Sequence, residues 1–411
     1  MLNKIQVSER KRKQIGRQIF NRYVKQVMKK SKEKNKMKNV IKKLFAVILI
    51  TLIVSCSLIP ALAVVLSDIN AKTKRIESLV RIDNACNKTQ GLTVTASGSN
   101  KRLFVVRINN LENKAILYMY KNYTKMSTEG TNEYRAFELL DFAKHANGMA
   151  IDDDNIYITC SSGNNVRVAR IERAVLWHMY NSTNNDPLTA DSDGVTIMPV
   201  VNNDRTPYNK KIIGITYYED GKFIVMTEPT GNYLNFATAY ISDDDNDGKN
   251  DDNDVLVVSN DATKTFKVYF DDTNSTFNQD IGYDSDCGLF IVRAYKTQTI
   301  DENGNEVDVA TTNNSIIWIN LNSLPIENNR VYTKTNSEYR IIKVNKSSDI
   351  FKIYELESVS IGSDNYMYAS VNVHVWDSNT YSQYMLDPII RIKRPDEANG
   401  SDQFLVSNIN A

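Results

Sequence analysis

The sequence predicts an all-β domain that folds as a five-bladed β-propeller, and two observations lead to this prediction. First, one short phrase recurs five times, usually as a polar residue, a small residue and then apolar-x-apolar. Second, a polar turn and another apolar strand follow each copy. The copies cover residues 90–94, 147–151, 213–217, 279–283 and 357–361, at offsets of 57, 66, 66 and 78 residues. Recurrence at a nearly constant offset is typical of repeat architectures, in which each unit covers an apolar face of its neighbour.

Short runs rich in β-branched and aromatic residues supply the other strands of each repeat. Second strands are expected at 103–106, 156–158, 223–225, 289–292 and 366–368, and third strands at 116–120, 166–171, 316–319 and 389–392. Fourth strands are expected at 137–140, 195–198, 266–269 and 351–354. A similar run at 79–83 precedes the first copy and is expected to complete the last blade, which would close the ring. Residues 171–180 are the exception, because their spacing predicts one or two helical turns.

The alternative to a propeller is a pair of β-sandwiches, which also contain many short strands at regular spacing. The recurrence of one phrase favours the propeller. No composition shift marks an internal boundary, so residues 78–411 are expected to form one domain. As an architecture, this domain resembles the β-propellers of secreted bacterial proteins.

Charge is distributed unevenly along the chain. Residues 1–43 contain 16 Lys or Arg against Glu9 and Glu33, a net charge of +14, so the remainder carries −13 of the total of +1. Residues 44–66 follow as 23 residues without a charge, long enough to cross a bilayer. A short polar stem, 67–77, leads into the β domain. The basic segment is best explained as a cytoplasmic flank, and a nucleic-acid partner is not expected.

The uncharged segment fits three export mechanisms. Translation from Met37 would give a signal peptide with a small-residue cleavage site at 61–63. Translation from Met1 would leave 44–66 as a membrane anchor with its basic flank inside. Residues 53–56 also resemble a lipobox that ends at Cys56. All three mechanisms place residues 67–411 outside the cytoplasm, secreted or anchored to the cell membrane.

The most specific local pattern is an acidic loop. Oxygen ligands stand at positions 1, 3, 5, 9 and 12, the residue at position 7 offers its carbonyl, and Gly248 stands at the turn position. These positions are Asp243, Asp245, Asp247, Asp251 and Asp254, with Lys249 at position 7. The loop resembles the calcium loops of EF-hands, dockerins and thrombospondin type 3 repeats, which implies a structural Ca²⁺. Strands are expected on both sides, at 236–241 and 255–258. The alternative is a solvated acidic loop without an ion.

Cysteine and histidine are too sparse for thiolate or zinc chemistry. Cys86, Cys160 and Cys287 allow either one disulfide and a spare thiol or three buried thiols. The three histidines, His145, His178 and His374, show no zinc-ligand spacing.

Polar residues at the start of the innermost strands are the candidate ligand site. Propellers generally bind ligands where these strands begin, so the resemblance implies one funnel. Its lining would be Gln90, His145, Asn147, Gln279, Asp280 and Glu357. The alternative is that these side chains bond to turn backbone between blades.

Two functions from different classes remain. The favoured hypothesis is an exported, calcium-stabilised propeller that binds a glycan, the cell wall or a protein, with Trp177, Trp318 and Trp376 as sugar platforms. The other is an extracellular glycoside hydrolase or lyase that uses Asp280 and Glu357 as its carboxylate pair.

Overall fold

The computed structural model describes residues 18, 21, 22 and, with short gaps, 69–393. The gaps are 71–72, 76–85, 87, 96–99, 110–112, 128–131, 144–145, 163–164, 184–185, 220, 244–253, 271–275, 301–305, 321–328, 334–335, 337, 346–352, 365, 378–381 and 387–388. The strands all belong to one compact unit, whose main part is Asp68–Glu397. Among the described residues no helix is both long and apolar enough to span a bilayer. Segment 44–66, predicted as an export or anchor helix, lies outside them.

The described strands form antiparallel sheets, and the first strand of each overlaps one copy of the repeated phrase. The first sheet comprises β3 (Lys88–Val94), β4 (Leu103–Ile108), β5 (Ala115–Tyr120) and β6 (Tyr134–Leu139). The second comprises β7 (Met149–Ile151), β8 (Asn155–Ser162), β9 (Asn165–Glu172) and β10 (Val195–Asn202). The third comprises β11 (Ile212–Glu219), β12 (Lys222–Thr230) and β13 (Tyr233–Ser242), whose outer edge pairs with β14 (Val255–Val258) and β15 (Thr265–Tyr269).

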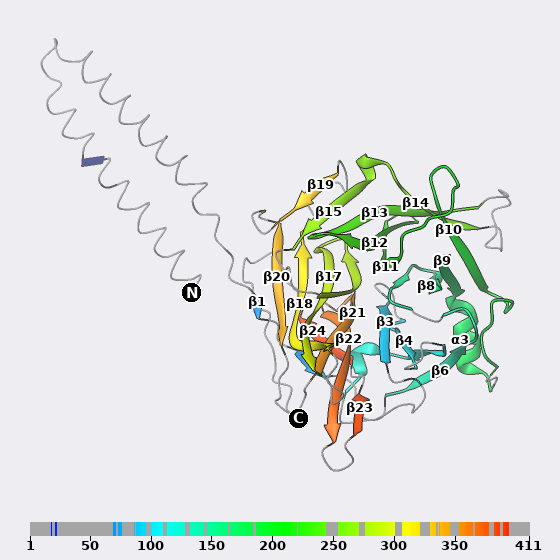
Figure 1. Ribbon diagram of the computed structural model, residues 1–411. Coiled ribbons are helices and arrows are strands. Elements are labelled where there is room, and N and C mark those ends of the chain that lie inside the picture. Colours follow the sequence, from blue (N-terminus) through cyan, green and yellow to red (C-terminus); the bar gives the residue numbers. More distant parts are fainter. Residues whose placement is uncertain are drawn as a thin grey trace, which may run out of the picture. The chain divides into compact units, whose positions relative to one another are not determined.

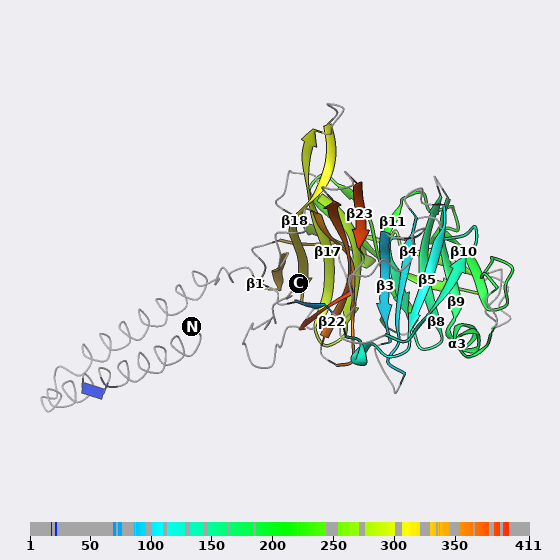
Figure 2. The ribbon, with the colours of Figure 1, turned by 90° about the horizontal axis from the view of Figure 1, so that it is seen from below.

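Two further sheets complete the set. The fourth comprises β16 (Thr276–Asp284), β17 (Gly288–Ile300), β18 (Glu306–Ile319) and β20 (Tyr339–Asn345). The fifth comprises β21 (Ile353–Ile361), β22 (Tyr366–Asp377), β24 (Ile389–Lys393) and β2 (Thr73–Arg75). Short strands extend the edges: β1 (Ile69–Asn70) on β20, β19 (Arg330–Tyr332) on β15 and β23 (Ser382–Leu386) on β22. A parallel pairing of β10 with β14 joins the second and third sheets. The long β17–β18 hairpin projects beyond its sheet (Figure 2).

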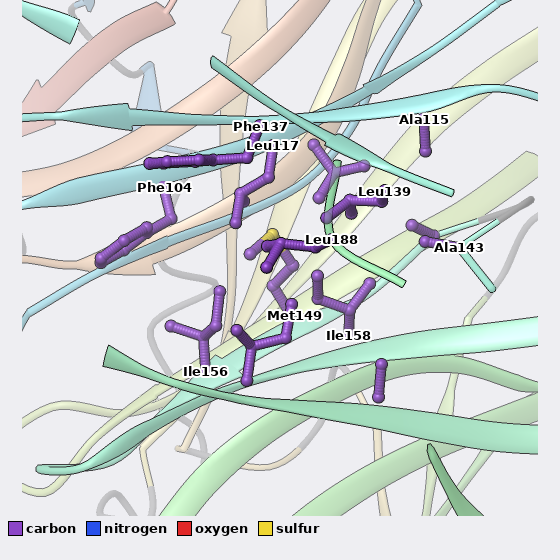
Figure 3. Packing of buried hydrophobic residues seen from close by; sticks show 14 of the residues in the cluster. Phe104, Ala115, Leu117, Phe137, Leu139, Ala143, Met149, Ile156, Ile158 and Leu188 are labelled. Atoms are coloured by element: carbon purple, nitrogen blue, oxygen red, sulfur yellow. The ribbon is translucent and has the colours of Figure 1, made fainter. Parts of the chain in front are cut away.

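The sheets are arranged in a ring around their first strands (Figure 1). β3 packs against β7, β7 against β11, β11 against β16, β16 against β21, and β21 against β3. Buried hydrophobic side chains fill the space between each pair of neighbouring sheets. Between the first two, Phe104 and Leu117 face Met149, Ile156 and Ile158 (Figure 3). Each sheet therefore depends on its two neighbours to bury its faces, and the predicted propeller architecture is confirmed.

The ring closes through residues from the N-terminal side. β2 pairs antiparallel with β24, from Thr73 opposite Ile392 to Arg75 opposite Ile390. An N-terminal closing strand was predicted at 79–83, but these residues lie outside the described part of the chain. The closing role belongs to 73–75.

One predicted strand was assigned wrongly. Residues 351–354 were expected to be the fourth strand of the fourth repeat, but Ile353 and Tyr354 begin β21, the innermost strand of the next sheet. The fourth strand is β20, which pairs with β18 from Tyr339 to Asn345. The sequence runs from Ile353 into the repeated phrase without a Gly, Pro, Asn or Asp, so nothing in it marks the true start of β21.

Non-β elements are few among the described residues. The predicted helix is α3 (Arg173–Asn181), which packs against β9. Arg135 of β6 donates to the carbonyl oxygens of Met179 and Tyr180 at the C-terminus of α3. A cation there compensates the free carbonyls and the negative end of the helix dipole, so α3 connects the first sheet to the second. Two 3₁₀ turns, η2 (Tyr123–Lys125) and η3 (Ala262–Lys264), also lie between strands of the β domain.

The cysteines are buried thiols. Cys86, Cys160 and Cys287 are each buried and form no disulfide, which selects the second of the two predicted alternatives. Burial raises the pKa of the Cys160 thiol to about 12, so this thiol is unreactive at neutral pH.

Candidate functional site

The polar-small dipeptide of the repeated phrase lies at a β-bulge in four of the sheets. The strand register shifts between Thr89 and Leu92, Ile212 and Gly214, Asn278 and Ile281, and Leu356 and Ser358. In the second sheet, pairing begins only at Met149, just after the dipeptide. A bulge bends its strand and increases the local twist. The phrase therefore marks the place where each innermost strand bends.

The small position of the phrase is occupied by Gly91, Gly148, Gly214, Asp280 and Ser358. A Cβ on Gly148 would lie 2.8 Å from the backbone nitrogen of Ile215 and 3.0 Å from Oδ1 of Asp280. One on Gly214 would lie 3.0 Å from the same oxygen. The two glycines thus leave the space that the Asp280 carboxyl group fills, and neighbouring innermost strands approach too closely for any larger residue there.

Asp280 is a fully buried carboxyl group at this junction, with 0% of its surface exposed. Its Oδ1 accepts the backbone N–H of Ile281 at 2.8 Å, and its Oδ2 lies within hydrogen-bond distance of the Ser358 hydroxyl. Backbone N–H groups of Met149 and Ile215 also point at it. Burial raises the pKa of Asp280 well above its usual range, and these hydrogen bonds offset only part of the shift. The protonated acid is therefore favoured.

The hydrogen bonds of Ser358 fit a protonated Asp280. The Ser358 hydroxyl has one proton but lies near two acceptors, Oδ2 of Asp280 and the carbonyl oxygen of Leu92 at 3.2 Å, and it accepts the Leu92 N–H at 2.9 Å. If Asp280 donates its own proton to Ser358, the hydroxyl donates to Leu92 and every group is satisfied. Asp280 then connects four innermost strands.

The other predicted funnel residues bond to neighbouring backbone and side chains. Glu357, 3% exposed, accepts from Asn372, whose Oδ1 accepts the Thr89 N–H at 2.8 Å. Gln90 donates to the Thr89 carbonyl at 2.9 Å, and Gln279 donates to Glu355 at 2.8 Å. Asn147 is buried, and His145 lies outside the described residues. Of these contacts of the funnel residues only that of Gln90 is to backbone, and the others are to side chains, so the contacts do not decide between the predicted funnel and the alternative of bonds to turn backbone. Asp280 and Glu357 are both placed in the packed interior.

The acidic loop is closed by a ladder between β13 and β14. Ser242 pairs with Val255, so the two ends of 243–254 lie next to each other. Asp254 is 1% exposed, and its Oδ2 lies 2.6 Å from Nη1 of Arg170, which also donates to Thr196 at 3.2 Å. Asp245, Asp247, Lys249 and Asp251 lie outside the described residues, so the calcium site remains a prediction. Its last residue already has a cationic partner in the core.

Two adjoining hollows lie where the first and second sheets meet. They have volumes of about 350 and 510 Å³, and both are lined by Asn100, Arg102 and Trp177. The first hollow is also lined by Lys121, Asn122, Lys125, Met126, Asn132 and Glu133. The second is also lined by Asp153, Asp154, Asn155, Glu172, Arg173 and Ala174. These residues lie in the turn before β4, between β5 and β6, between β7 and β8, and at the start of α3. The hollows are therefore at the end of the sheets where innermost strands finish, opposite to the predicted funnel.

Arg102 and Trp177 separate the two hollows. The Arg102 guanidinium carbon lies 3.7 Å from the centre of the Trp177 ring, a cation–π contact. Trp177 also stacks with Tyr180 at 5.4 Å between ring centres. The predicted sugar platform at Trp177 is thus covered by Arg102 on one face. Trp318 is a core residue that donates to the Cys287 carbonyl at 2.6 Å, and nothing is described of the Trp376 side chain.

Known proteins resemble this chain only in fold. No family model matches, and no curated protein matches the sequence. Among solved structures, the catalytic domain of a Coprinopsis cinerea GH62 α-L-arabinofuranosidase aligns with 10% identity and a TM-score of 0.32, covering 79% of this chain and 97% of that one. A subtype N11 neuraminidase-like protein of a flat-faced bat isolate has 9% identity and a TM-score of 0.33, over 79% and 94%. Aleuria aurantia lectin has 9% identity and a TM-score of 0.30, over 76% and 82%. At these values the likeness bears on neither activity nor ligand.

Proposed function

We propose that the chain is an exported β-propeller that binds a glycan in the two hollows beside Trp177. The observation that carries this proposal is the lining of the hollows. Asn100, Asn122 and Asn132 line the first hollow, and amide side chains suit a ligand with many hydroxyl groups. The Oδ1 atoms of Asn122 and Asn132 accept from their own turns, so their amide nitrogens would serve this role. Volumes of about 350 and 510 Å³ are within the range of small-ligand sites. A concave, polar lining suits a glycan better than the flatter surface of a protein partner.

The buried state of the two candidate catalytic carboxyl groups supports binding over hydrolysis. A glycosidase needs both carboxyl groups in contact with a substrate and with water. Asp280 and Glu357 are 0% and 3% exposed, and both bond within the ring. Neither lines either of the two hollows.

Filling the second hollow is expected to weaken glycan binding strongly. Ala174 is exposed and lines this hollow from the first turn of α3, so Ala174→Trp places an indole where the ligand lies. A glycan array first identifies a glycan that the full chain binds. We expect Ala174→Trp to bind that glycan at least tenfold more weakly. His178→Trp is the matched control, because His178 is exposed on the same helix and lines neither hollow. Equal binding by both variants would place the glycan elsewhere, and an array without any bound glycan would reject the function.

The proposal includes a structural Ca²⁺ in the loop 243–254. Adjacent loop ends at Ser242 and Val255 support it, since a closed hairpin brings the acidic positions together. Asp243, Asp245, Asp247, Asp251 and the carbonyl of Lys249 would hold the ion, while Asp254 anchors the loop to Arg170.

Calcium is expected to raise the melting temperature of the full chain. An ion that binds only the folded state at a hundredfold excess over its dissociation constant adds about 2.7 kcal/mol of stability. Asp245→Ala should remove this shift and leave the Arg170–Asp254 ion pair intact. Identical melting curves in calcium and in chelator would mean that the loop is solvated and binds no ion.

A further inference from the structure

We infer that the first hollow is an anion subsite, which selects glycans that carry a carboxylate, sulfate ester or phosphate ester. The inference rests on the proposed glycan binding and adds the class of glycan. Three observations carry it: the surroundings of Arg102, the charges that line the first hollow, and the different charges of the second.

Arg102 is a buried cation that pairs with no carboxylate in the described part of the chain. It is 6% exposed, and among the described residues its guanidinium forms no ion pair or hydrogen bond, only the contact with Trp177. Burial, and next the positive charge of Arg173, lower the pKa of Arg102. A guanidinium that loses part of its hydration and lies near a second cation is less favourable in the free protein than an exposed one. An anion in the adjoining hollow would relieve it, because guanidinium pairs well with carboxylate, sulfate and phosphate groups.

The first hollow has an excess of positive charge. Arg102, Lys121 and Lys125 line it against the single carboxylate of Glu133. Glu133 is already bonded to Lys121, with 2.6 Å between Oε2 and Nζ. Lys125 is exposed at the end of η2 and has no ion pair among the described residues. Arg102 and Lys125 are therefore the two cations available to an incoming acidic group, with the three lining asparagines beside them for sugar hydroxyls.

The second hollow has the opposite balance. Asp153, Asp154 and Glu172 line it against Arg102 and Arg173. Arg173 is occupied by the chain itself, since its Nη1 donates to the carbonyl oxygen of Asp152 at 2.8 Å and to that of Asp153. An acidic group is therefore favoured in the first hollow, and an uncharged part of the same glycan in the second.

The test compares each acidic glycan with its neutral counterpart, by calorimetry on the full chain. Trigalacturonate is paired with its methyl ester, and dextran sulfate and dextran phosphate are each paired with dextran. We expect at least one acidic member to bind tenfold or more tightly than its counterpart, and the pair that does so identifies the anion. Lys125→Gln should reduce that preference about tenfold. Lys264→Gln should not change it, because Lys264 ends the similar turn η3 outside the hollow. Glu133→Gln should increase it, because it removes the one carboxylate and releases Lys121.

The outcomes separate this inference from the proposed function. Equal binding of acidic and neutral members, lost in Ala174→Trp, would overturn the anion subsite and leave glycan binding in place. A preference for acid that is unchanged in Lys125→Gln and in Glu133→Gln would also overturn the subsite. If none of the five probes binds, the subsite is rejected for all three anions, and the glycan array then decides on the proposed function by itself.

Discussion

Asp280→Asn is expected to fold normally and to be less sensitive to pH than the natural chain. The amide is isosteric with a protonated carboxyl group: its nitrogen donates to Ser358, and its oxygen accepts the backbone N–H of Ile281. In the natural chain the folded state binds a proton that the unfolded state releases above about pH 4. The pKa of Asp280 is raised on folding, so its contribution to stability is complete below the unfolded pKa and is lost as the pH rises through the folded pKa. Between the unfolded pKa and the folded pKa, the unfolding equilibrium constant of the natural chain should rise about tenfold for each pH unit, relative to that of Asp280→Asn.

Denaturant unfolding between pH 4 and pH 9 measures this difference. Asp280→Ala is the opposite control, because it leaves the N–H groups of Ile281, Met149 and Ile215 buried without their acceptor. Each such loss costs about 1–3 kcal/mol, so a total above about 3 kcal/mol is expected. Parallel pH profiles for the natural chain and Asp280→Asn would mean that Asp280 is ionised in the ring.

Arg170→Met is expected to destabilise the domain by about 3–5 kcal/mol, since it leaves the Asp254 carboxylate buried without a partner. The two side chains are each 2% exposed, with 2.6 Å between Nη1 and Oδ2. Arg170 stands on β9 and Asp254 immediately precedes β14, so the pair joins the second sheet to the third.

Urea unfolding at pH 7 tests this prediction. The double variant Arg170→Met, Asp254→Leu should recover most of the lost stability, because replacing both charges removes the unpaired carboxylate. Lys121→Gln is the surface control, and its unfolding free energy should stay close to that of the natural chain, since the Lys121–Glu133 pair is exposed. If the double variant is no more stable than Arg170→Met, the pair acts through its packing and not through its charge.

Most strands could be predicted from the sequence, because each repeat contains its own alternation of apolar and polar residues. It was a poor guide to where strands begin and end in the fourth and fifth repeats, where residues 353–354 belong to β21 and not to an outer strand. It also could not show why the phrase recurs. The polar-small dipeptide lies at a bulge, where glycines leave space for a neighbouring strand and for Asp280. The need for a small residue there arises only from the packing of the innermost strands in the ring.

The proposed site lies at the end of the sheets opposite to the predicted funnel, and a related reason explains why the sequence did not indicate it. Gln90, Gln279 and Glu357 are prominent in the sequence because they recur, whereas Arg102, Lys125 and Trp177 belong to unrelated turns and to α3. These turns meet only because the first two sheets pack face to face, as Phe104 does against Met149. A local signal existed at Trp177, but nothing in the sequence indicates that Arg102 lies on its ring.

The closing pair β2–β24 also determines the order in which the molecule can be assembled. A chain is synthesised from its N-terminus, and Thr73 finds its partner Ile392 only after nearly all of the domain has been made. Contacts so distant in sequence form slowly, since the entropy of closing the loop must be overcome first. Until then β24 has an open edge that another chain can pair with. Strand β2 is thus made early but placed last, and a chain that lacks β24 cannot form this closing pair.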